Sequence, residues 1–119
     1  MHFDRFTIVL LVLRPDAPQL SDDDADALQD AHLAHLAGLH ESGFLLAAGP
    51  LLGGPDSAFR GLCLLNVGSE RAGELMEQDP AVRAGRFSVV VLPWMVPGGA
   101  MSFSATRFPH SAAEAAGAG

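Results

Sequence analysis

Apolar residues in this chain gather into four short runs that are separated by Gly, Pro and polar residues. Runs of this length that are rich in Val, Leu and Phe predict β-strands. The first run is apolar at nearly every position, which is typical of a strand buried on both faces. The predicted strands span 6–13, 44–52, 59–67 and 87–95, and the turn Gly53-Gly54-Pro55-Asp56-Ser57 joins the middle two into a hairpin.

Two helices are predicted between these strands. Ser21 is an N-cap candidate, and the three aspartates after it suit the positive end of a helix over 22–42 that stops at Gly43. Ser69 is the equivalent cap of a shorter helix over 70–78, which the following Asp-Pro pair ends. The order β-α-β-β-α-β predicts an α+β, ferredoxin-like fold, in which an antiparallel sheet carries both helices on one face.

Residues 6–13 and 88–92 lack polar alternation, although two helices can cover only one side of a sheet. The other face therefore needs a cover, and symmetric pairs are the commonest oligomers. We expect a homodimer through this sheet face.

The pattern changes after residue 96, so we expect a folded domain over 1–96 and a C-terminal tail over 97–119. Residues 101–105 alternate in polarity, which predicts one extra strand that docks on the partner. The final Ala and Gly residues are typical of a solvated end.

Composition excludes several classes of function. The chain has 119 residues, enough for one domain with its own core, and 14 acidic against 7 basic residues give a net charge of −7, which excludes a nucleic-acid partner. A single cysteine, Cys63, fits a reducing compartment, by default the cytoplasm. The first apolar run is too short to span a bilayer and precedes Arg14-Pro15-Asp16, so we expect neither a membrane segment nor a targeting segment.

His32 is the best candidate for chemistry. On a helical wheel it falls in the middle of an apolar arc that is formed by Ala25, Leu28, Leu36 and Leu39. One interpretation is a buried neutral ring that is tied to a backbone carbonyl. The other is an acid or base that lines a pocket between helix and sheet, because histidine exchanges protons near neutral pH.

Asp79 is a candidate partner for His32. Its simplest role is that of a turn residue before Pro80, with its carboxylate on nearby backbone N–H groups. Because both predicted helices lie on one side of the sheet, the end of the second could also approach the middle of the first. A carboxylate there would fix the tautomer of His32 and strengthen it as a proton acceptor.

Other sites are weaker. His32 and His35 have a spacing that can hold a metal, but no convincing third ligand is visible, so we expect neither a metal nor a cofactor. Cys63 lies between leucines in a predicted strand, where a packing thiol is expected. Trp94 fits either an interface or a pocket wall.

Four pieces occur together in a known order: His32-Leu-Ala-His-Leu36, Gly43-Phe-Leu-Leu-Ala-Ala-Gly-Pro50, Gln78-Asp-Pro80 and Ala84-Gly85. From residue 6 to residue 95 the chain resembles the YCII family of small bacterial proteins. The resemblance implies a dimeric α+β barrel with a His–Asp pair at His32 and Asp79. The family is similar in fold to muconolactone isomerases and includes a dehydrochlorinase. Relatives often carry an Arg shortly before the histidine, where this chain has Leu28-Gln29-Asp30.

Two hypotheses about function follow. The first is a cofactor-independent acid–base enzyme, a lyase or isomerase that acts on a small cyclic or carbonyl compound, with His32 as the proton carrier and Asp79 as the orienting group. The residues expected to bind its substrate are His35, Arg60, Gly49, Pro50 and Trp94. The second is a non-catalytic dimeric module that binds a small ligand or a protein, in which His32 only satisfies a hydrogen bond in the core.

Overall fold

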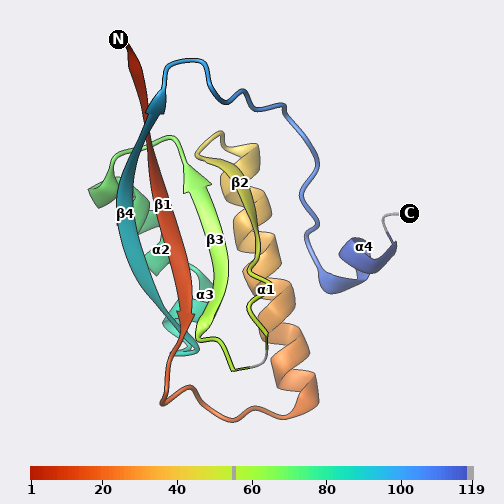
Figure 1. Ribbon diagram of the computed structural model, residues 1–119. Helices are drawn as coiled ribbons and strands as arrows, with labels where there is room; N and C mark the ends of the chain where they lie inside the picture. Colours follow the sequence, from red (N-terminus) through yellow and green to blue (C-terminus); the bar gives the residue numbers. More distant parts are fainter. Residues whose placement is uncertain (55, 118–119) are drawn as a thin grey trace.

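The computed structural model describes residues 1–54 and 56–117. The elements follow in the order β1 (Phe3–Leu13), α1 (Asp22–Glu41), β2 (Leu45–Pro50), β3 (Phe59–Leu65), α2 (Ser69–Glu77), α3 (Pro80–Arg83), β4 (Phe87–Pro97) and α4 (Ala112–Gly117). The strands form one antiparallel sheet in the order β2-β3-β1-β4, and α1, α2 and α3 cover one of its faces (Figure 1). The predicted α+β, ferredoxin-like arrangement is confirmed.

The core lies between the sheet and its helices. Every second residue of β1 is buried on the helix side, from Thr7 through Val9 to Leu11, because side chains of a strand alternate between its two faces. Thr7 is the polar member of this row, and its hydroxyl donates to the carbonyl of Val67 (2.6 Å). Leu65 and Met76 pack in the same core and are fully buried.

The first helix begins and ends where the sequence predicts. Ser21 is the N-cap of α1, and its side chain accepts a hydrogen bond from the N–H of Asp24 (3.2 Å). Ser42 is the C-cap, and Gly43 follows with φ of 87°, a backbone conformation that favours glycine. None of the helices in the described part of the chain has the length and apolar character that crossing a bilayer requires.

The second helical region differs from the prediction at both ends. The expectation that Ser69 caps it is wrong, because Gly68 is the N-cap of α2 and Ser69 is its first helical residue. Gly68 has the extended backbone that an N-cap needs, and glycine is common at that position. At the other end Asp79 does stop α2, but it also caps a further short helix, α3, that the sequence analysis did not predict.

The face of the sheet away from the helices remains apolar and open. Leu10 pairs with Val90 and Ile8 with Leu92 on this side, and both residues of β4 are exposed in the single chain. Within one chain the first strand is therefore fully buried on its helix side only. The tail reaches this face where the ring of Phe103 contacts that of Phe6 edge to face, 5.7 Å between centroids.

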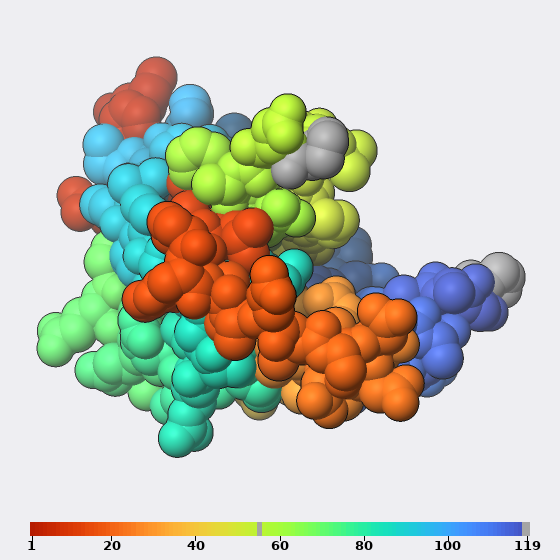
Figure 2. All heavy atoms as spheres, turned by 90° about the horizontal axis from the view of Figure 1, so that it is seen from below, coloured from red at the N-terminus to blue at the C-terminus, as the bar shows by residue number. Residues whose placement is uncertain are grey.

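The C-terminal tail does not form the predicted strand within the chain. Residues 101–105 have no regular structure, and docking of that segment on a partner remains a prediction. The end of the tail forms the short helix α4 beside α1, and most of its residues are exposed, as expected of a solvated end. The tail contacts α1 at Asp30, His40 and Glu41, and Figure 2 shows its end, in blue, beside this helix.

Truncation of Leu65 to Ala is expected to lower the free energy of unfolding by about 2–5 kcal/mol, because Leu65 is fully buried and its loss leaves a cavity. Leu52→Ala is the matched control, since Leu52 is 95% exposed and the same change there removes no core contact. Urea unfolding followed by circular dichroism measures both. Equal midpoints for the two variants would contradict this description of the core.

Candidate functional site

His32 lies on the face of α1 that packs toward the sheet. Its neighbours Leu36 and Leu39 on the same face are buried with it, and only 8% of the His32 surface is exposed. The ring of Phe87 at the start of β4 meets the imidazole edge to face, with centroids 6.0 Å apart. The predicted placement of an ionisable ring in an apolar stripe is therefore correct.

Asp79 has both of the roles that the sequence left open. Its Oδ1 accepts the N–H of Ala81 (3.0 Å) and so caps α3, in which Pro80 takes the first position that proline favours. Its Oδ2 lies 2.6 Å from Nδ1 of His32. Asp79 is completely buried, so the turn at the start of α3 is also the support for the imidazole.

This geometry fixes the tautomer of His32. An ionised carboxylate only accepts hydrogen bonds, so with Asp79 ionised the proton between the two side chains lies on Nδ1 of His32. The neutral ring then carries its lone pair on Nε2. Among the described residues no buried side-chain nitrogen or oxygen lacks a partner, and Nε2 has no protein partner, so Nε2 faces open space.

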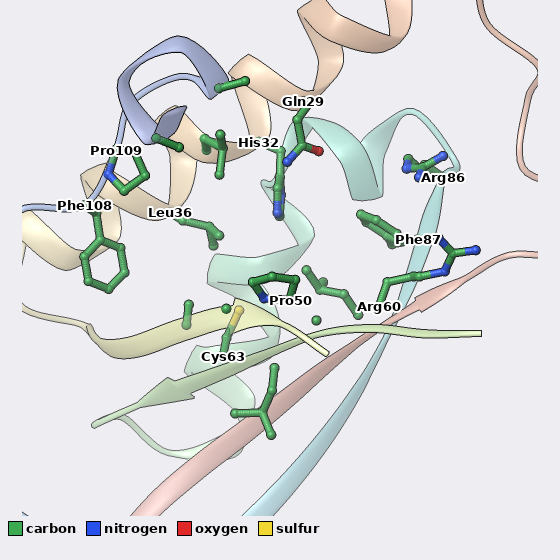
Figure 3. Close-up of a pocket in the computed structure, with 18 of the residues that line it drawn as sticks. Gln29, His32, Leu36, Pro50, Arg60, Cys63, Arg86, Phe87, Phe108 and Pro109 are labelled. Carbon is green, nitrogen blue, oxygen red and sulfur yellow. The ribbon is translucent and has the colours of Figure 1, made fainter. Parts of the chain in front are cut away.

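That space is a cavity of about 680 Å³ between α1, the sheet and the tail. Figure 3 shows the ring of His32 above its floor, with Phe108 and Pro109 on one side and Arg60, Arg86 and Phe87 on the other. A concave site of this size, with apolar walls and a few polar groups, is typical of small-molecule binding. The cavity thus offers a ligand access to Nε2.

Cys63 lies in the floor of the cavity and is not a nucleophile. Burial, with a smaller contribution from the charge of Asp79, raises the pKa of its thiol to about 12. The thiol therefore stays protonated at neutral pH, and the thiolate is the reactive form. The predicted role as a packing thiol is consistent with this state.

The structure brings some of the predicted binding residues to the cavity and leaves others outside it. Gly49, Pro50 and Arg60 are part of its wall. His35 is not, because it points to α2, where Nε2 is 3.0 Å from the carbonyl oxygen of Leu75. Trp94 pairs with Phe6 on β1 and is exposed on the open face of the sheet.

The histidine spacing does not produce a metal site. Nδ1 of His32 is bonded to Asp79, and Nε2 of His35 is bonded to a backbone carbonyl. Across residues 1–54 and 56–117 there is no group of three or more His, Cys, Asp or Glu side chains placed to hold a metal ion.

Several cavity residues were missed by the sequence analysis. Arg86 follows the Ala84-Gly85 pair and Gln29 precedes His32 by one helical turn, so both lay close to motifs already identified. The tail residues had a clearer signal. Ser111-Ala-Ala-Glu114 matches the pattern of a helix start, and Ser111 Oγ does accept the N–H of Glu114 (3.2 Å).

The tail is fastened to the helix that carries His32. Phe108 stacks on the ring of His40, 3.9 Å between centroids and 11° between planes. Nε2 of His110 donates to Glu41 (2.7 Å), and the N–H of Ala112 donates to Asp30 (2.8 Å). These contacts place Phe108 and α4 along the cavity wall.

Comparison with known proteins agrees with the fold. Residues 8–95 match the model of the YCII-related domain. The chain belongs to the YCII family. The YCII domain thus contains His32 and Asp79, whereas the tail with Phe108 and α4 lies beyond the match.

A solved structure gives a comparison with a named enzyme. The YCII domain is similar to 5-chloro-2-hydroxyhydroquinone dehydrochlorinase, TftG, from Burkholderia phenoliruptrix AC1100, in complex with 2,5-dihydroxybenzoquinone. The two are 25% identical with a TM-score of 0.53, and the alignment covers 75% of this chain and 92% of TftG. The search of curated proteins gave no match.

The thiol of Cys63 is expected to resist labelling while the chain is folded. With a pKa of about 12 only about 10⁻⁴ of it is thiolate at pH 8, against roughly 0.2 for an unfolded cysteine, so thiolate content alone slows the reaction on the order of 10³-fold. Reaction with Ellman's reagent at pH 8, with and without denaturant, measures this ratio. Cys63→Ala is the blank in both states, and rapid labelling of the folded chain would contradict the burial of this thiol.

Proposed function

We propose that this YCII domain is an acid–base enzyme that works without a cofactor, a lyase or isomerase on a small cyclic or carbonyl compound. His32 carries the proton, and Asp79 orients the imidazole. The observation that supports this most directly is the 2.6 Å bond from Nδ1 to Asp79, which leaves Nε2 facing the cavity as a proton acceptor. A core histidine with a purely structural role has no need of an open cavity at its second nitrogen.

The likeness to TftG favours one reaction within this class, the loss of HCl from a chlorinated hydroxylated ring. A hydroxyl proton of the ring first passes to Nε2 of His32 and from there to the carbon that bears chlorine. A second hydroxyl then gives its proton to Nε2, and its bonding pair forms a C=O bond. The ring double bonds shift, and chloride leaves with the electrons of the C–Cl bond.

This sequence is balanced without any outside electron acceptor. The ring loses one proton and one chloride in total, and its oxidation to a quinone is matched by replacement of C–Cl with C–H. One base that both accepts and returns protons is sufficient, which agrees with the presence of a single imidazole in the cavity. An isomerase would use the same first step and stop after the proton has moved.

The proposal predicts that 5-chloro-2-hydroxyhydroquinone releases chloride in the presence of the protein. His32→Ala and Asp79→Asn are expected to lower kcat/KM by about 10²–10⁴, the first by removing the proton carrier and the second by disturbing its tautomer. The assay follows chloride with an ion-selective electrode under nitrogen, so that air oxidation of the ring does not contribute.

His35→Gln is the matched control for these variants. His35 lies one turn from His32 on the same helix, outside the cavity, and a glutamine amide can also donate to the carbonyl of Leu75. Its kcat/KM is expected to stay within about threefold of the wild type. Chloride release at the uncatalysed rate with wild-type protein would overturn the proposed dehydrochlorination, and ligand binding without turnover would favour a non-catalytic binding module.

We further propose that a second copy of the chain covers the open sheet face. The face is apolar where Val90 and Leu92 are exposed, and exposed apolar patches of monomers are normally small. Two identical faces suit a symmetric pair, in which each copy supplies the cover that the other needs.

Light scattering at micromolar concentration is therefore expected to give twice the chain mass of 12.4 kDa. Leu92→Glu should shift the protein toward the single-chain mass, because it places a charge in the centre of the proposed interface. Leu52→Glu, at an exposed leucine of the hairpin, should leave the mass unchanged. A single-chain mass for wild-type protein would contradict the pairing.

A further inference from the structure

The charges around the cavity are opposite to those of the whole chain. The protein carries 14 acidic and 7 basic residues, yet no residue that lines the cavity is acidic within the described part of the chain. Two of the seven arginines, Arg60 and Arg86, line it together with His32. A protein with a net charge of −7 repels anions in general. A cavity whose charged side chains are all basic is a local exception to this rule.

Neither arginine of the cavity is neutralised by a carboxylate of the described chain, whereas Arg14, Arg71 and Arg107 each form an ion pair. Both Arg60 and Arg86 are partly buried, which makes an uncompensated charge costly. An anionic ligand in the cavity would supply the partner charge that Arg60 and Arg86 lack within the described chain.

A hydrogen bond positions the guanidinium of Arg60, and a ring contact positions that of Arg86. Nε of Arg60 donates to the carbonyl of Ser57 (3.0 Å), which leaves its terminal N–H groups for other acceptors. The N–H of Arg86 donates to Ala81 (3.1 Å), and its guanidinium lies over the ring of Phe87, 5.1 Å from the centroid. Planar N–H donors of this kind suit the oxygens of a delocalised anion.

The opposite side of the cavity is apolar and comes from the tail. Phe108, Pro109 and three alanines of α4 form this wall, and Figure 3 shows Phe108 and Pro109 across the cavity from Arg60 and Arg86. His32 lies between the two sides. The tail lies outside the YCII match, so this apolar wall comes from residues beyond the matched domain.

We infer that the cavity takes a small organic anion with an apolar ring, whose oxyanion lies at Arg60 and Arg86 and whose ring rests on Phe108 and α4. The inference rests on the proposed function, because it assigns the substrate class of the same site. In this pose the ring lies below Nε2 of His32, where a proton can be exchanged with it. The arginines also stabilise the negative charge that the ring acquires when its proton is removed.

Two ring compounds that differ mainly in charge test this inference by calorimetry. The first, 2,5-dihydroxybenzoquinone, is an anion at neutral pH, because each hydroxyl is conjugated to a carbonyl and ionises like a carboxylic acid. The second is its uncharged dimethyl ether. Arg60→Gln and Arg86→Gln are each expected to raise Kd for the anion roughly tenfold or more, through loss of a charge-assisted hydrogen bond, and to leave Kd for the ether unchanged.

Two further variants separate charge from shape. Arg83→Gln is the matched control, since Arg83 is exposed on α3 and does not line the cavity, and its Kd values should stay within about twofold of the wild type. Phe108→Ala should raise Kd for the anion and for the ether by similar factors, because it removes an apolar contact from both ligands. Inorganic phosphate has charge but no ring, so its Kd is expected to be at least roughly tenfold higher than that of the ring anion.

The inference is overturned if the anion does not bind at millimolar concentration, if the arginine variants bind it as the wild type does, or if they weaken both probes equally. Neither probe contains chlorine, so binding is independent of turnover. Arginine-dependent binding without chloride release would refute the proposed dehydrochlorination alone. Chloride release that is unchanged in both arginine variants would refute the inference alone.

Discussion

The hydrogen bond between His32 and Asp79 joins two parts of the chain that are 47 residues apart in sequence. Both side chains are buried, so each needs the other, because a buried polar group without a partner is costly. The other oxygen of Asp79 caps α3. The end of α3 in turn sets where β4 begins, and Arg86 and Phe87 stand at that point. One residue, Asp79, therefore links the position of His32 to the start of α3 and, through α3, to the basic side of the cavity.

The sequence predicted most of the fold because its signals were local. Apolar runs gave the strands, Ser21 and Gly43 gave the limits of α1, and the order of elements gave the ferredoxin-like sheet. The short helix α3 was missed because four residues are too few to show helical periodicity. Ser69 was wrongly predicted as the N-cap because serine and glycine both occur at that position. The extended backbone residue before α2 is Gly68.

The sequence predicted site residues that stand out in their own segment. It did not predict those that reach the cavity only through the packing of distant segments. His32 stood out because a polar ring in an apolar stripe is conspicuous on a helical wheel. Asp79 could be named as its partner because the predicted topology places both helices on one face, and because the resemblance to the YCII family implies this pair. Arg86 and the tail were missed, because their contribution depends on how β4 and α4 lie against α1. The alternation at 101–105 pointed to a strand, although no strand among residues 1–54 and 56–117 pairs with this segment.

The two faces of α1 separate the His32–Asp79 pair from the contacts of the tail. Its inner face holds His32 against Asp79, while Asp30, His40 and Glu41 hold the tail from its other side. The hydrogen bonds of the tail use no atom of the His32–Asp79 pair, so a change in the tail can alter the apolar wall and leave the imidazole in place. The converse does not hold, because Asp79 also accepts the N–H of Ala81. Loss of the Asp79 side chain would therefore disturb α3 and the start of β4 as well. The shape of the apolar wall is therefore more open to change in this chain than the direction of Nε2 is.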